Sequence, residues 1–543
     1  MRAAQRRTGG RRRGVGAISA THTHGGGIAD RTAADAGAAA AGSAASPTTS
    51  GALAIVLLGW IGAIKTTGAT LATVSLVEAA QDMGLSPTMR SAAAAAISLA
   101  IAATAVAAGV AADRLGRRRV LMGSYVLAGG ANLAIFVFPS GWVYVVGLVV
   151  AGLGYGAMLT GSYAYVKAVA PGKSLGMGLG LLGMFTTIVT MVTSLGGGAL
   201  AYWDWRWLFL IVPAMCLVSF VLTPRLLPPM PRVGSGPVDL VGLALLGGGM
   251  VLVISGVSRV TAHPPDRAGW LFIAAGVVLF VIWVIVELRG RAPAFPVRIF
   301  RSRAFAAAVV VGLAGPVVTA AMALTVSDAV QYVQQGSAFA TTLSLEPFYI
   351  AGGVGGLIAG RLLSSGVSER RVMTLSPLVA AAGFLALVPL TPDSSPWLFL
   401  PGVVIAGAGI FAGMTAQAQV VIHAVTKNAY GAVTSSKTSI GQLGSALGMV
   451  LTMLVIKIFA GLDLYRDLKA AGITEAQVHS ALSTIESGSA PGGPPDLADF
   501  PHAVGQALHS MSTALHGVML VSAVVMVGAA ALVWVLMRQP RPR

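Results

Sequence analysis

Long uncharged stretches alternate with short charged segments along most of this chain. Residues 91–112 carry no Asp, Glu, Lys or Arg, and neither do residues 120–166. A helix needs about 20 apolar residues to cross the hydrocarbon core of a bilayer. The first stretch is therefore long enough for one membrane-spanning helix. The second is long enough for two, with a break at Pro139-Ser140-Gly141.

This alternation continues along the chain and predicts an all-α membrane protein with fourteen transmembrane helices. Breaks such as the proline-rich residues 228–231 separate one predicted helix from the next. The predicted helices are residues 52–80, 88–111, 120–138, 142–165, 174–202, 206–224, 239–258, 268–287, 304–328, 341–363, 372–390, 396–422, 431–459 and 515–537.

The composition argues against a soluble enzyme. Hydrophobic residues make up 55% of the chain and charged residues 10%, whereas soluble proteins have roughly 45–50% and about 25%. The net charge of +17 comes largely from Lys and Arg in the first 50 residues and in alternate loops. Basic residues in this arrangement are typical of cytoplasmic segments. We therefore expect a multi-pass protein of the cell inner (plasma) membrane with both termini in the cytoplasm.

No metal site and no cofactor are expected from the cysteine and histidine content. Cys216 is the single cysteine, which excludes a disulfide framework and a cysteine-based metal site. Four irregularly spaced histidines lie in or beside residues 461–514, and we interpret them as part of a solvated loop on the outer side. They are His479, His502, His509 and His516.

The densest charge cluster within the apolar region is Gly109-Val-Ala-Ala-Asp113-Arg114-Leu-Gly116-Arg117-Arg118-Arg119, between the second and third predicted helices. It resembles the signature loop of the major facilitator superfamily. Further segments resemble the fourteen-helix drug/proton antiporter branch of that superfamily. They include Trp203-Asp-Trp-Arg-Trp207, Val238-Asp-Leu-Val-Gly242 and Gly441-Gln-Leu-Gly-Ser-Ala-Leu-Gly448.

The resemblance implies a major facilitator fold, in which two six-helix halves rock about a midplane site and two extra helices are inserted between them. The expected parts are a disordered basic cytoplasmic tail (1–50), an N-terminal six-helix half (51–232), and two extra helices with a cytoplasmic linker (233–302). They continue with the first five helices of the C-terminal half (303–460), an extracellular loop (461–514), and the last helix with a cytoplasmic tail (515–543).

The signature loop is a candidate conformational gate. Asp113 can accept backbone N–H bonds at a helix N-terminus, while Arg114 and Arg117 can pair with acids or carbonyl groups. Gly109 and Gly116 would permit close approach and a tight turn, and Arg118 adds to the same cluster. The alternative is simple anchoring on the cytoplasmic side. A second basic turn, residues 360–371, lacks the Asp-Arg pair and is interpreted as a decayed copy of the loop.

Four ionisable residues lie inside predicted helices, where a charge facing lipid is unfavourable. Lys65, Asp328, Glu346 and Lys437 are therefore candidates for substrate contact or proton coupling. For the two acids the alternative is a cap or ion pair at the outer rim. For the two lysines it is a structural pairing.

Two departures from the family pattern bear on coupling. Residues 148–154 of the fourth predicted helix lack the Arg and Gln that the branch carries there, and the first predicted helix lacks the branch's mid-membrane acid. The usual proton route therefore does not transfer to this chain.

We expect a secondary active transporter, in which alternating access drives proton-coupled efflux of amphipathic drugs or small molecules. Its partners would be a small amphipathic substrate, protons and the lipid bilayer, with no nucleic acid, and the protein would be a monomer. No constellation for catalysis is recognised, so an enzyme is not expected. The alternatives are a specialised lipid or metabolite carrier with atypical coupling, or a transport-inactive receptor or scaffold on the same fold.

Overall fold

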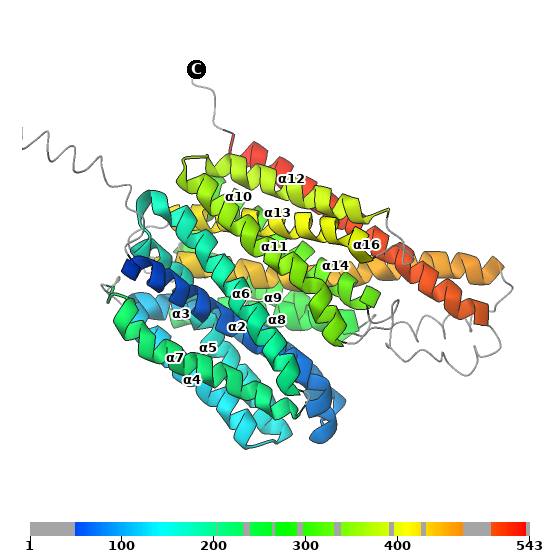
Figure 1. Ribbon diagram of the computed structural model, residues 1–543, viewed down its shortest axis with the longest axis horizontal. Helices are drawn as coiled ribbons and strands as arrows, with labels where there is room; N and C mark the ends of the chain where they lie inside the picture. The colour runs from blue at the N-terminus through cyan, green and yellow to red at the C-terminus, as the bar shows by residue number, and fades with distance from the viewer. Residues whose placement is uncertain are drawn as a thin grey trace, which may run out of the picture. The chain divides into compact units, whose positions relative to one another are not determined.

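The computed structural model describes residues 49–201, 203–230, 232, 239–262, 266–289, 297–330, 338–389, 396–424, 430–470 and 501–538. These residues form fourteen α-helices and three short 3₁₀ turns, with no strand among them (Figure 1). The first six helices are α2 (Thr49–Asp82), α3 (Pro87–Leu115), α4 (Arg117–Val137), α5 (Gly141–Val169), α6 (Leu175–Ala201) and α7 (Leu208–Leu226). Then follow α8 (Leu240–Ala262), α9 (Arg267–Arg289), α10 (Arg303–Asp328), α11 (Ala338–Ser364), α12 (Glu369–Leu387), α13 (Pro396–His423), α14 (Tyr430–Ala470) and α16 (Pro501–Leu536).

The all-α membrane fold predicted from the sequence is confirmed. Thirteen of the described helices are long and apolar enough to cross a bilayer, and α8 contains a shorter apolar stretch, Val241–Val257. Most helices begin and end within a few residues of the predicted bounds. The largest differences are in α14 and α16, which extend into the segment predicted as an outer loop. Residues 1–48 and 471–500, which include most of the predicted tail and the middle of that loop, lie outside the described residues.

Helices α2 to α7 share one apolar core in which tyrosines join neighbouring helices. Tyr155 of α5 accepts a hydrogen bond from the Asn132 side chain of α4 at 2.9 Å. Gly68 of α2 lies so close to the Tyr155 ring that no larger residue fits there without rearrangement. The buried hydroxyl groups thus keep polar partners inside the apolar core, as buried polar groups require.

The turn before α7 is fixed by a cluster of aromatic and charged side chains. Trp205 packs edge-on against Tyr144 and Phe209, at ring-centroid distances of 5.9 Å and 6.0 Å. Arg206 pairs with Asp82, the last residue of α2, at 2.7 Å. The hydrogen bond from Arg206 holds the pKa of the Asp82 carboxyl below its ordinary value. The tryptophan-rich segment therefore joins the end of α2 to the start of α7.

Helices α8 and α9 pack on each other, and α8 also packs on α3 and α14. An apolar cluster links these helices: Val106 and Val110 of α3 lie with Leu246 and Met250 of α8, and Leu443 of α14 packs against the same group. The two extra helices thus lie beside the junction between α3, from the first six helices, and α14, from the last six.

A second junction between the first and last six helices runs along α6 and α11, which lie side by side (Figure 1). Small residues allow the two backbones to approach closely. A Cβ atom on Gly180 of α6 would lie 2.7 Å from the carbonyl oxygen of Gly356 in α11. The backbone N–H of Met177 donates a hydrogen bond to Ser364 Oγ at 2.9 Å. These contacts involve the beginning of α6 and the end of α11, so they lie toward one end of the bundle.

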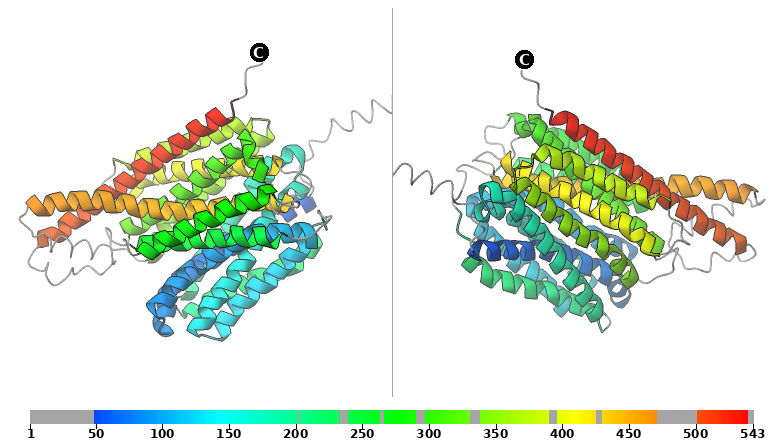
Figure 2. Two further views of the ribbon diagram at one scale, coloured as in Figure 1. Left: turned by 180° about the vertical axis from the view of Figure 1, so that it is seen from behind. Right: turned by 45° about the horizontal axis from the view of Figure 1, so that its top comes forward.

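At the opposite end, α14 and α16 extend past the other helices (Figure 2). Helix α14 has 41 residues and α16 has 36, whereas α12 has 19. A transmembrane helix needs only about 20 residues, so both helices are longer than the bilayer requires.

Candidate functional site

The signature loop turns sharply between α3 and α4 at Gly116. This residue has a φ of +98°, a backbone conformation that favours glycine. Asp113 and Arg117, on either side of the turn, form an ion pair at 3.0 Å between Oδ1 and Nη2. Both side chains are buried, with 7% and 5% of their surfaces exposed. Because the two residues lie on either side of Gly116, their ion pair holds the turn in a single geometry.

The remaining residues of the predicted gate surround this pair. Gly109 is buried in α3, while Arg114 and Arg118 are partly exposed. Arg117 also contacts the Met230 sulfur at 3.3 Å, in the segment that follows α7. The structure thus brings the predicted gate residues together at one turn. Arg117 pairs with an acid, as predicted, and this acid is Asp113 of the same turn.

The second basic turn, residues 360–371, also contains an acid. Glu369, the first residue of α12, accepts one hydrogen bond from the Gln419 side chain at 3.1 Å, and its Oε1 lies 2.7 Å from His423 Nδ1. Both partners belong to α13. Gly366 precedes it with a φ of +95°. The turn between α11 and α12 therefore repeats the arrangement of a positive-φ glycine beside a carboxylate, although the carboxylate here faces α13.

Lys65 and Lys437 come from different parts of the bundle and lie near each other. Lys65 is in α2 and Lys437 in α14, and the charge of Lys437 acts on Lys65. The Lys437 ammonium lies over the ring of Tyr163 in α5, 4.1 Å from its centroid, which is a cation–π contact. Both lysines are partly exposed. The two lysines thus lie near each other, one from the first six helices and one from the last six.

Gln417 of α13 was not among the residues expected from the sequence. Its side chain is 1% exposed, and neither of its polar atoms has a described hydrogen-bond partner. The Gln417 side chain lies beside Gly312 of α10. A Cβ atom added to Gly312 would meet this side chain and would also lie 3.1 Å from the Ile440 side chain of α14. Ile440 is one turn beyond Lys437. The only sequence signal for Gln417 was a polar residue within the apolar run of α13.

The two predicted acids are placed apart from the gate. Glu346 lies in α11, partly exposed and one turn before Tyr349. Asp328 is the last residue of α10, and its side chain lies outside the described residues. Their predicted role in proton coupling stays a prediction.

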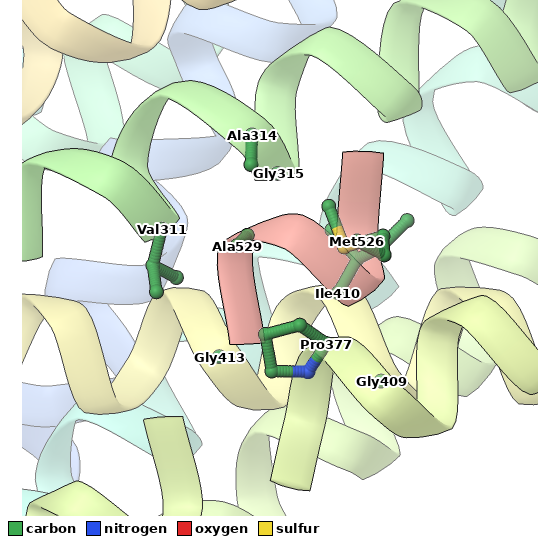
Figure 3. Close-up of a pocket in the computed structure, with 9 residues that line it drawn as sticks. All are labelled: Val311, Ala314, Gly315, Pro377, Gly409, Ile410, Gly413, Met526 and Ala529. Atoms are coloured by element: carbon green, nitrogen blue, oxygen red, sulfur yellow. The ribbon is translucent and has the colours of Figure 1, made fainter. Parts of the chain in front are cut away.

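A small pocket lies within the last six helices (Figure 3). All its lining residues are apolar, and Met526 and Ile410 face Ala314 and Val311 across it. Because it offers no polar group to a ligand, we do not assign the substrate site to it. The full lining is Val311, Ala314, Gly315, Pro377, Gly409, Ile410, Gly413, Met526 and Ala529.

Comparisons with known proteins agree with this arrangement. The sequence profile of the Major Facilitator Superfamily matches residues 58–449. The puromycin resistance protein pur8 of Streptomyces alboniger is 28% identical over 392 residues, 70% of this chain and 77% of the relative. The multidrug efflux pump LfrA of Mycolicibacterium smegmatis is 23% identical over 451 residues, 81% of this chain and 87% of the relative. The solved proton:xylose symporter XylE has a similar fold, with a TM-score of 0.53 and 13% identity over 88% of this chain and 95% of that chain.

Proposed function

Because the chain belongs to the major facilitator superfamily and is a multi-pass secondary transporter, we propose that it exports small amphipathic molecules across the cell membrane in exchange for protons. Relatives named for puromycin resistance and for multidrug efflux support the direction and the substrate class. The basic residues of the tail and of alternate loops support a cytoplasmic location for both termini and for the Asp113 turn. We further propose that the protein works as a monomer.

The observation that carries the proposal is the junction at one end of the bundle. The beginning of α6 meets the end of α11, and Val110 near the end of α3 belongs to the cluster that also contacts α14. With the Asp113 turn in the cytoplasm, this junction would close the cytoplasmic side of the transporter. Separation of the same helices would open that side, as alternating access requires.

Asp113 and Arg117 would act on this junction indirectly. Their ion pair fixes the end of α3, and α3 is one of the helices that pack against α14 across the two halves. A change in the turn would therefore alter the position of α3 against α14. We propose the pair as a positioning element for closure.

Proton coupling is the second part of the proposal. Glu346 lies inside the α11 span, and Asp328 is the last residue of helix α10, directly after the α10 span. A carboxylate that is alternately dehydrated and hydrated can take up and release a proton during the cycle. We therefore propose these two acids as the proton carriers in place of the family's usual residues.

The test uses purified protein reconstituted in liposomes with an imposed pH gradient. Amphipathic dyes and antibiotics should move against their concentration gradient when the pH gradient is present, and the movement should stop when an ionophore removes it. Transport at the same rate with and without the pH gradient would refute proton coupling. Failure of every compound to move would refute the export of amphipathic molecules.

A further inference from the structure

The pairing of Lys65 with Lys437 has a chemical consequence for the substrate. Both residues lie within helices that qualify as membrane spans, and they belong to opposite halves. Two like charges that lie near each other within membrane-spanning helices repel, and each is less well hydrated than in water. Such a pair is usually accompanied by a group of opposite charge.

No such group is present among the described side chains. The described ion pairs join Arg117, Arg206, Arg259 and His423 to acids, and neither lysine takes part in any of them. Lys437 contacts the Tyr163 ring, which carries no formal charge. Within the part of the chain that the structure describes, the two ammonium groups therefore lack a carboxylate partner.

A third polar group lies near the same part of α14. Gln417 is buried, its amide lacks a described partner, and it lies beside the turn of α14 that follows Lys437. An amide offers two N–H donors. Lys65 in the first half, and Lys437 and Gln417 in the second, could each donate a hydrogen bond to an anion.

We propose that Lys65 and Lys437 bind the acidic group of an amphipathic organic anion, a carboxylate, sulfonate or phosphate ester, and that Gln417 donates a hydrogen bond in the same site. This inference rests on the proposed export function and specifies its substrate class. The anion supplies the negative charge that the described side chains do not. A cationic substrate would instead add a third positive charge to the pair.

The proposal also relates binding to movement. Lys437 is in α14 and Tyr163 in α5, so their cation–π contact joins the two halves. An anion that draws Lys437 away from Tyr163 would weaken that contact, and a ligand shifts a conformational equilibrium by its different affinity for the two states.

The experiment measures binding of three fluorescent probes that share one dansyl body. Dansylglycine carries a carboxylate, dansylglycinamide is neutral, and dansyl-ethylenediamine carries an ammonium group. Purified wild-type protein should bind dansylglycine at least tenfold more tightly than either of the others. Lys65→Met and Lys437→Met should each reduce dansylglycine affinity to that of the neutral amide.

Three controls separate the site from general effects. Lys173→Met removes an exposed lysine before α6 and should leave all three affinities unchanged. Lys65→Arg and Lys437→Arg keep the charge and should retain at least part of the preference. Thermal unfolding of each variant in detergent checks that the methionine variants remain folded.

Equal affinity for all three probes, preference for the ammonium probe, or no measurable binding of any probe would each overturn the proposal. So would an unchanged preference in both folded methionine variants. Accumulation of the ammonium or neutral probe in proteoliposomes would still support the export function, so failure of the anion site is distinguishable from failure of that function.

Discussion

Gly176 of α6 and Gly360 of α11 meet backbone to backbone, so that a Cβ atom added to Gly176 would lie 2.9 Å from the carbonyl oxygen of Gly360. One helix turn later in α6 and one turn earlier in α11, Gly180 and Gly356 approach each other in the same way. The junction therefore depends on the absence of side chains at these positions, a common way for membrane helices to approach closely.

The first prediction tests this junction with a larger side chain. Gly180→Val should weaken closure by about 1–3 kcal/mol, the usual range for overpacking, and should slow transport. A cysteine at Ser364, whose hydroxyl group accepts the Met177 N–H, should then react severalfold faster with maleimide. The matched control is Gly183→Val in the same helix, because a Cβ there meets nothing within 4 Å. Equal reactivity in the two variants would contradict a role of this contact in closure.

The second prediction concerns the buried ion pair. Asp113→Asn keeps the side-chain shape but removes the charge that pairs with Arg117, and it should slow transport at least tenfold while the amount of protein in the membrane stays near wild type. Arg119→Gln, which changes an exposed residue of the same loop, should have little effect. Initial rates in proteoliposomes provide the measurement. Wild-type turnover in Asp113→Asn would leave anchoring as the role of the loop.

The third prediction concerns coupling. The double variant Asp328→Asn with Glu346→Gln should lose accumulation driven by the pH gradient, while substrate binding and downhill exchange remain measurable. Neutral side chains of similar shape cannot take up and release the proton. Glu78→Gln, at an exposed acid near the end of α2, is the control. Continued accumulation against the gradient in the double variant would show that the proton carrier is elsewhere.

The fourth prediction concerns topology. In a Cys216→Ser background, a cysteine at Ser489 should react with a membrane-impermeant reagent in intact cells, whereas a cysteine at Arg118 should react only after the membrane is disrupted. Cys216 itself is buried in α7, so its replacement mainly removes background labelling. The opposite labelling pattern would invert the proposed orientation, and with it the assignment of the closed end to the cytoplasm.

The helices themselves could be predicted from the sequence because a membrane span leaves a local signal. An uninterrupted apolar window and a following turn are sufficient to place α3, α4 and α5 within a few residues. The apolar pattern does not predict the extension of α14 to Ala470, because the added residues include charged side chains outside the apolar window. Helix continuation beyond the bilayer depends on local backbone hydrogen bonds rather than on hydropathy.

The candidate site could be predicted only in part. Asp113 and Arg117 are four residues apart, so their proximity follows from a single turn. The contact of Lys437 with Tyr163 joins residues that are far apart in the chain, and its partner depends on how the two halves pack. Gln417 likewise becomes informative only when burial and the lack of a described partner are known. The chemistry of single residues indicates both lysines as candidates, but it does not show that the two lie near each other.

Helix α14 begins close to Lys437 and continues as one helix to Ala470. At about 1.5 Å per residue, its 41 residues span roughly 60 Å, about twice the thickness of the hydrocarbon core. If a helix of this length moves as one rigid body, a small tilt at one end gives a large displacement at the other. A tilt of about 10° at the Lys437 end would move the far end by roughly 10 Å. The end of α14 that extends past the other helices would therefore move much further than the helices within the bilayer when the two halves rock. A label attached there would report that movement.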